Sequence, residues 1–172
     1  MPTHYLLVDG YNVIYSNQEL AVLAEDNIDS ARVKLCDALC EFKALSRYRI
    51  MAIFDAHLVP GGEGSVTKYR NIKVVFTKEA ETADHYIERA AYRLAQQKDR
   101  ITVATSDTLE QLIILGRGAA RISSEDLWVE IISAKEEARA RYNSTRPIKR
   151  NPIESLVDEE TAKILEAMRY GK

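Results

Sequence analysis

The amino-acid sequence predicts an α/β protein in which helices cover both faces of a mostly parallel β-sheet, followed by a C-terminal helical extension. Short apolar segments at residues 5–8, 50–54, 72–76 and 101–104 are rich in Val, Ile, Leu and Phe, as buried strands are. Amphipathic helical segments lie between most of them. Strands that alternate with helices form parallel sheets, because each parallel neighbour needs a crossover over one face.

The predicted elements have individual signatures. Residues 60–64 combine a proline with glycines, which predicts an extended loop able to close over a substrate. Ser123 or Ser124 is suited to cap a long helix, since a hydroxyl accepts hydrogen bonds from unpaired N–H groups. Trp128 is expected in the core. In chain order we expect strand 5–8, helix 29–45, strand 50–54, loop 60–64, edge strand 65–69, strand 72–76, helix 82–97, strand 101–104, helix 109–115, helix 125–142 and helix 158–170.

A chain of 172 residues suits one domain with a short appendage. We expect residues 1–143 to form the domain and residues 144–172 to form a basic linker and an amphipathic helix. The linker is indicated by Ser144, Thr145, Pro147, Asn151 and Pro152.

The composition excludes several classes of protein. No apolar stretch approaches the roughly 20 residues of a membrane span, and the start lacks the features of a signal peptide, so we expect a cytoplasmic protein without a membrane partner. Cys36 and Cys40 are too few for a zinc or iron–sulfur site and predict two buried reduced thiols. The three histidines have no metal-binding spacing.

The charge pattern is locally basic although the net charge is only −2. Residues 64–78 and 139–150 contain Lys and Arg without any acid, with aromatic residues between them. Such stretches suit a phosphate backbone and stacked bases, and the alternative is a solvated charged face. The candidate RNA-backbone contacts are Lys68, Arg70, Lys78 and Arg121.

Acidic residues follow three of the predicted strands. Asp9, Asp55 and Asp107 come after strands 5–8, 50–54 and 101–104, the last separated from its strand by two residues. Carboxyl ends of parallel strands meet at one edge of a sheet, where open α/β folds bind ligands. Like charges packed there repel one another unless a hard divalent cation lies among them. Together with Asp84, these acids are the candidate ligands of Mg²⁺ or Mn²⁺.

Further polar residues are candidates for catalysis at this edge. Glu81 and Asp84 lie around the start of helix 82–97, Asn12 can return its amide towards Asp9, and Ser106 can donate to a phosphate. Each could equally have an ordinary structural role, because acids stabilise helix starts and Asn and Ser close turns. The candidate catalytic set is Asp9, Asn12, Asp55, Glu81, Asp84, Ser106 and Asp107.

A metal-dependent reaction on phosphate is the chemistry that this set favours, since a bound cation neutralises the anion and activates water. Other chemistries fit less well. There is no phosphate-binding Gly-x-x-x-x-Gly-Lys-Ser/Thr loop and no Gly-x-Ser-x-Gly elbow. A haloacid-dehalogenase type of phosphatase usually has a second aspartate where this chain has Tyr11.

Five short motifs occur in a fixed order between the first strand and the helix after Ser124. They are Asp9-Gly10-Tyr11-Asn12, Phe54-Asp55-Ala56-His57, Phe76-Thr77-Lys78-Glu79, Glu81-Thr82-Ala83-Asp84 and Thr105-Ser106-Asp107.

With these motifs the chain closely resembles the YacP-like branch of the NYN domain family. The resemblance implies a PIN-like nuclease domain with a Rossmann-like sheet and an acidic metal centre. It implies metal or catalytic roles for the candidate set above, with Ser106 in support. It also implies an activity, because the best-known bacterial branch is a ribosome-associated endoribonuclease that cuts mRNA in the decoding A site.

The sequence therefore predicts a metal-dependent endoribonuclease that acts on mRNA, with the ribosome as a partner. In this hypothesis Asp9, Asp55, Asp84 and Asp107 hold the metal, while Asn12 and Ser106 orient the phosphate. Two alternatives remain: a binding module for RNA or the ribosome that does not cut, and a small metal-dependent phosphatase.

Overall fold

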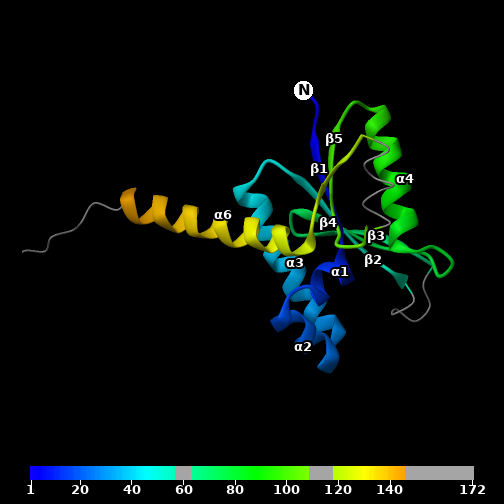
Figure 1. Ribbon diagram of the computed structural model, residues 1–172, viewed down its shortest axis with the longest axis horizontal. Coiled ribbons are helices and arrows are strands. Elements are labelled where there is room, and N and C mark those ends of the chain that lie inside the picture. Colours follow the sequence, from blue (N-terminus) through cyan, green and yellow to red (C-terminus); the bar gives the residue numbers. More distant parts are fainter. Residues whose placement is uncertain (57–62, 109–117, 146–172) are drawn as a thin grey trace, which may run out of the picture. The chain divides into compact units, whose positions relative to one another are not determined.

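The computed structural model describes residues 1–56, 63–108 and 118–145 of the chain. The chain divides into two units, Met1–Ala138 and Arg139–Lys172. The first unit contains a six-stranded sheet with the strand order β3-β4-β2-β1-β5-β6. Figure 1 shows the strands with the helices beside them. Within the described part of the second unit, residues 139–145 continue the last helix of the first.

The sheet is parallel except at one edge, as the sequence predicts. The parallel strands are β1 (His4–Asp9), β2 (Arg49–Phe54), β4 (Ile72–Phe76), β5 (Arg100–Ala104) and β6 (Ala120–Ile122). The edge strand β3 (Ser65–Tyr69) runs antiparallel to β4. Because Val8 pairs with both Ala52 and Ala104, the carboxyl ends of the three central strands lie at one level.

Helices pack on both faces of this sheet, which confirms the predicted architecture. One face buries Leu7, Ile53 and Val75 against α4, which lies along one side of the sheet in Figure 1. The other face packs against the remaining helices. The helices are α1 (Gly10–Tyr15), α2 (Gln18–Asp26), α3 (Ile28–Leu45), α4 (Ala83–Gln96) and α6 (Ser124–Thr145).

Helices α1 and α2 occupy a region where no helix is predicted. Each is capped by the residue before it, whose side chain accepts a hydrogen bond from a backbone N–H of the first turn. The capping residue is Asp9 for α1 and Asn17 for α2. Gly10 has no room for a side chain, since a Cβ there would lie 2.2 Å from Cε1 of Phe54. Gly10 is therefore the start of a helix that packs tightly on β2.

Strand β6 is also absent from the prediction, because three residues give no readable period. At the other end of the chain, Ser144 and Thr145 are expected in a linker but belong to α6. Their hydroxyls donate to the carbonyl of Arg141 at 2.8 and 3.0 Å, which satisfies them within the helix. The expected division into residues 1–143 and 144–172 stays a prediction, although its first two linker residues are helical.

Other expectations agree with the structure in detail. Ser123 caps α6, because its hydroxyl accepts from the N–H of Asp126 at 3.0 Å. Trp128 is half-buried against the core and donates to the carbonyl of Val13 at 3.0 Å. Cys36 and Cys40 are buried free thiols.

Several predicted segments lie outside the described residues. They are most of the loop at 60–64, helix 109–115, the rest of the linker from residue 146 and helix 158–170. Among the described helices, none has both the length and the apolar character needed to cross a membrane.

Candidate active site

The carboxyl edge of the sheet carries four aspartates. Asp9 ends β1, Asp55 follows β2, Asp107 follows β5 after two residues, and Asp84 lies in the first turn of α4. Asp9 and Asp55 are half-buried, whereas Asp84 and Asp107 are exposed. The strand order places β1 between β2 and β5, so the side chain of Asp9 is central to the group.

The pKa of Asp9 shows that these carboxylates interact. It rises from an ordinary value of 3.8 to about 6, mainly because burial disfavours the charged form. The N–H of Asn12 opposes the rise by donating to Asp9 Oδ1 at 3.4 Å, and the charges of Asp84, Asp107 and Asp55 add to it. The structure therefore brings together the four acids that the sequence singles out as metal ligands.

The donor set fits a hard divalent cation in its chemistry, since all four side chains offer carboxylate oxygens and their repulsion would be relieved by positive charge. Their spacing is wider than a coordination shell. Within the described ranges, no three Asp, Glu, His or Cys side chains lie close enough to hold a metal as they stand. Metal binding here requires the carboxylates to move inward.

Asn12 is fixed by a network that connects three elements. Its Oδ1 accepts from the N–H of Ser106 at 2.8 Å and from the hydroxyl of Ser124 at 2.5 Å. Because a backbone N–H can only donate, the acceptor must be the amide oxygen. The amide nitrogen of Asn12 is then the part of the side chain left to contact a substrate.

The same network occupies the hydroxyl of Ser106. This hydroxyl donates to Glu125 Oε2 at 2.8 Å and accepts from the N–H of Ser124 at 3.1 Å. The sequence leads us to expect that Ser106 donates to phosphate. In the structure it joins the loop after β5 to the start of α6, and its proton is already engaged.

Sequence reasoning missed several residues that shape this edge. Ser124 is fully buried and is predicted only as a helix cap. Thr77, 1% exposed, accepts from the N–H of Ala56 at 3.0 Å and so fixes the segment that carries Asp55. The signal available for Thr77 is its position, directly after β4 at the edge where the other strands end.

Arg32 of α3 was also missed. Its side chain is 12% exposed, and its guanidinium donates to the Tyr11 hydroxyl at 2.7 Å and lies 5.5 Å from the centre of the Phe76 ring. It also forms an ion pair with Asp29. Burial and, to a lesser extent, the charge of Asp55 raise the pKa of Tyr11, so Tyr11 lies near the acidic edge. Because Arg32 donates to Tyr11, it places a cation near the same edge. Nothing in the helical pattern of α3 points to this role.

Glu81 has different surroundings from the four aspartates. It forms an ion pair with Arg89 of α4 and is 15% exposed, although its Oε1 accepts no hydrogen bond from a described residue. Lys78 and His85 line a pocket of about 370 Å³ with it. The structure thus gives Glu81 a cation partner within the chain and keeps it out of the group that acts on Asp9.

The four candidate RNA contacts do not form one patch. Lys78 follows β4 at the acidic edge, and Arg121 lies on β6 at one side of the sheet. Lys68 and Arg70 lie on the opposite side, at and beyond β3, towards the amino ends of the parallel strands. Lys68 pairs with Lys73, three residues before the end of β4, which is about 10 Å from the acidic edge.

The mostly parallel sheet with acids at its carboxyl edge is the frame of a nuclease-like class of fold, and a family match assigns the chain to that class. The chain is a member of the YacP-like NYN domain family, which it matches over residues 6–170. This membership confirms the resemblance noted from the motifs, and it indicates a nuclease and an interaction with RNA.

Similar proteins come from Bacillus subtilis. The "Uncharacterized protein YacP" of strain 168 is 40% identical over 169 residues, which cover 96% of each chain. The crystal structure of Rae1 (YacP) is 36% identical with a TM-score of 0.71, over 97% of this chain and 95% of that one. A crystal structure of a point mutant of Rae1 is also 36% identical, with a TM-score of 0.69 over 84% of this chain and 86% of that one.

Proposed function

We propose that this protein is a metal-dependent endoribonuclease that hydrolyses mRNA in association with the ribosome, at the decoding A site. The observation that carries the proposal is the meeting of Asp9, Asp55, Asp84 and Asp107 at the carboxyl edge of the sheet, with a raised pKa at Asp9. Membership of a nuclease-like family supports the reaction class.

When bound by these four carboxylates, Mg²⁺ or Mn²⁺ supplies charge neutralisation and an activated water for attack on a phosphodiester. The chain's own residues provide the positioning. The Asn12 amide is held by Ser106 and Ser124, so its nitrogen can donate to a phosphate oxygen without adding charge. Lys78 brings a cation for the RNA backbone to the same edge.

The test compares RNA cleavage by the wild type, by Asp9→Asn and by Asp26→Asn. Asp26 is an exposed aspartate at the end of α2, so its variant is matched in chemistry but lies outside the site. Free RNA and translating ribosomes are both supplied as substrates. We expect cleavage by the wild type and by Asp26→Asn, at least a hundredfold less by Asp9→Asn and none in chelator, because the metal would supply the charge neutralisation and the activated water that the reaction needs. Equal rates, or full activity in chelator, would overturn the mechanism.

One observation favours a second candidate, an RNA-binding module of the same fold that does not cut. The described carboxylates do not form a ready coordination shell. Such a module binds RNA equally with and without Mg²⁺ and yields no new RNA ends, so a metal titration with product analysis separates it from the enzyme. Turnover of simple phosphate monoesters in the same assay would instead identify a phosphatase.

A further inference from the structure

A second pocket lies at the amino end of the sheet, away from the acids. Its volume is about 480 Å³, within the range of sites that hold a ligand the size of a nucleotide. The described residues that line it include four cations and no acid. The lining includes Tyr5, Lys43, Arg49, Met51, Lys68 and Lys73.

The strand register puts most of these side chains on one face. Tyr5 pairs with Arg49, Met51 with Lys73, and Lys73 with Lys68. Paired residues point to the same side of a sheet, and residues two apart on a strand do so too. Leu7, Ile53 and Val75 therefore share this face, and α4 covers them. The pocket is lined from this face towards the amino ends of the strands, and Lys43 of α3, which packs on the other face, also lines it.

The charges in this pocket are not balanced within the described residues. Lys68 and Lys73 are directly opposite each other across an antiparallel pair, an arrangement of like charges that destabilises a sheet. In the part of the chain that the structure describes, Arg49, Lys68 and Lys73 have no carboxylate within ion-pair distance. A bound anion would remove this repulsion.

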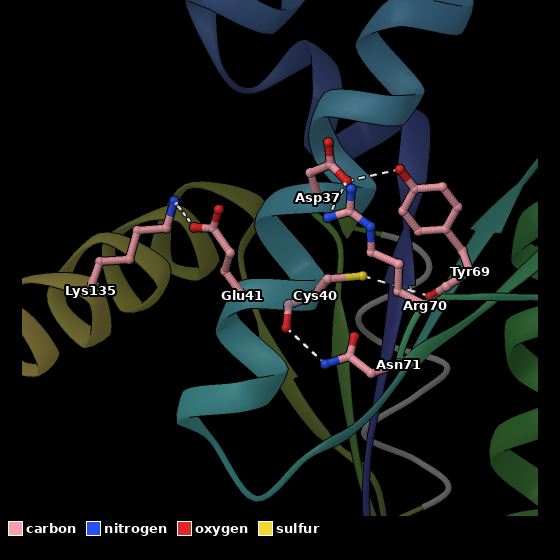
Figure 2. A network of polar contacts seen from close by, with 7 residues as sticks. All are labelled: Asp37, Cys40, Glu41, Tyr69, Arg70, Asn71 and Lys135. Atoms are coloured by element: carbon pink, nitrogen blue, oxygen red, sulfur yellow. Dashed lines mark hydrogen bonds and ion pairs between the residues drawn. The ribbon is translucent and has the colours of Figure 1, made fainter.

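One wall of the pocket, the turn between β3 and β4, is held in place by contacts within the chain. Figure 2 shows how the turn between β3 and β4 is held against α3. Asn71 donates to the carbonyl of Cys40 at 3.0 Å, and the Tyr69 hydroxyl donates to Asp37 at 2.8 Å. Lys43 donates to the carbonyl of Asn71. A preformed wall lowers the entropy cost of binding.

The same contacts separate the cations by role. Arg70, in the turn, pairs with Asp37 at 3.2 Å (Figure 2), so its charge is already balanced within the chain. Lys68 and Lys73 project from the strands beside it without such a partner among the described residues. The network uses Arg70 to hold the turn and leaves the two lysines to meet a ligand.

We propose that this pocket binds the phosphate backbone of single-stranded RNA at a second site, about 10 Å along the strands from the acidic edge. The proposal rests on the proposed function, since the RNA held here is the substrate that reaches the acids. Lys68, Lys73 and Arg49 contact phosphates. Tyr5 and Met51 supply apolar lining for the adjoining sugar or base.

The binding test uses the double variant Lys68→Gln/Lys73→Gln and the control Arg93→Gln/Lys98→Gln. The control removes the same charge from exposed residues at the end of α4 and beyond it. A fluorescent single-stranded RNA of about 12 nucleotides is titrated in chelator, so that no cleavage is needed. We expect about tenfold weaker binding for the pocket variant, with a log–log salt slope lower by about 1.4, and no change for the control. Equal affinities for the pocket variant and the wild type would overturn the proposal.

Unfolding does not account for the expected loss. Removing one of two facing charges, or both, relieves repulsion, so the pocket variant should melt at or above the wild-type temperature. A lower melting temperature would contradict the like-charge argument and with it the proposal.

Two further measurements identify the ligand and show how its binding relates to cleavage. The first measurement uses AMP as the ligand. If AMP binds the wild type as tightly as the RNA does, and the pocket variant no longer binds AMP, the pocket takes a small phosphorylated ligand and the backbone proposal fails. With cleavable RNA, the pocket variant should raise KM for a long RNA about tenfold and leave kcat unchanged. The two proposals can fail separately. If the wild type cuts no RNA but the pocket variant still binds RNA more weakly, the proposed function is wrong and the pocket remains an RNA-binding site.

Discussion

Asp9 lies where the fold makes the charged form of a carboxyl group unfavourable. Its charged form is opposed by burial and by three neighbouring carboxylates, and it is supported by a long hydrogen bond from the N–H of Asn12. A group placed in this way lowers stability at neutral pH. Such sites are typical of functional positions, where the local cost is tolerated because a ligand offsets it.

The first prediction follows from the pKa of Asp9. Because the folded-state pKa of about 6 lies above the ordinary 3.8, the native state binds the proton more tightly, and stability falls as pH rises from about 4 to about 6. The cost is complete above pH 6 and amounts to at most about 3 kcal/mol. In chelator, Asp9→Asn should therefore be more stable than the wild type at pH 7.5 and equal to it near pH 3.5. Denaturant unfolding at both pH values checks this, and a variant less stable at pH 7.5 would contradict it.

Ser124 gives a second prediction at the same scale. Its buried hydroxyl donates to the amide oxygen of Asn12, so Ser124→Ala removes one of the two donors that orient this amide. We expect a loss of about 1 to 2 kcal/mol, seen as a fall of roughly 2 to 8 °C in Tm. If Asn12 contacts phosphate, RNA cleavage should fall by about tenfold as well. Ser133→Ala, on an exposed part of α6, is the matched control and should change neither quantity.

Helix α1 illustrates what can and cannot be predicted at the scale of elements. The main strands were predicted well, because a short apolar run bounded by turn residues is typical of a buried strand. Helices α1 and α2 are short and separated by two residues, and their stability depends on caps and on tertiary packing. The contact between Gly10 and Phe54, which fixes α1, joins residues far apart in the chain and leaves no local pattern.

The third prediction tests that contact. In Gly10→Ala, the new Cβ would overlap the Phe54 ring, so α1 must shift away from β2 and take Asp9 and Asn12 with it. We expect a loss of about 1 to 3 kcal/mol in the free energy of unfolding, together with reduced cleavage. Phe54→Leu creates space at the same point. The double variant should therefore be more stable than the sum of the two single effects predicts, and strict additivity would show that the overlap is not the cause.

At the scale of the whole molecule, the sheet assigns different chemistry to its two ends. The acids were predictable as a group, because any parallel arrangement brings the carboxyl ends of the strands to one edge. Their partners were not. Asn12 and Ser124 are 112 residues apart, and the basic pocket depends on the register of several strands, which periodicity does not define. A basic pocket at one end and a group of acids at the other suit the proposed RNA substrate, a polyanion long enough to reach both.

The last prediction concerns the cation itself. Four carboxylates that repel one another in the native state should bind Mn²⁺ or Mg²⁺ more tightly than the unfolded chain does, where they are far apart. At a metal concentration about a hundredfold above Kd, the gain is about 2.7 kcal/mol, or roughly 5 to 10 °C in Tm for a chain of this size. NaCl at matched ionic strength measures simple screening of the same charges and should give a much smaller shift. Asp9→Asn begins from a higher Tm in chelator and should gain less from the metal, because its central ligand is neutral. An equal metal-induced shift in both proteins would place the cation elsewhere and remove Asp9 from its site.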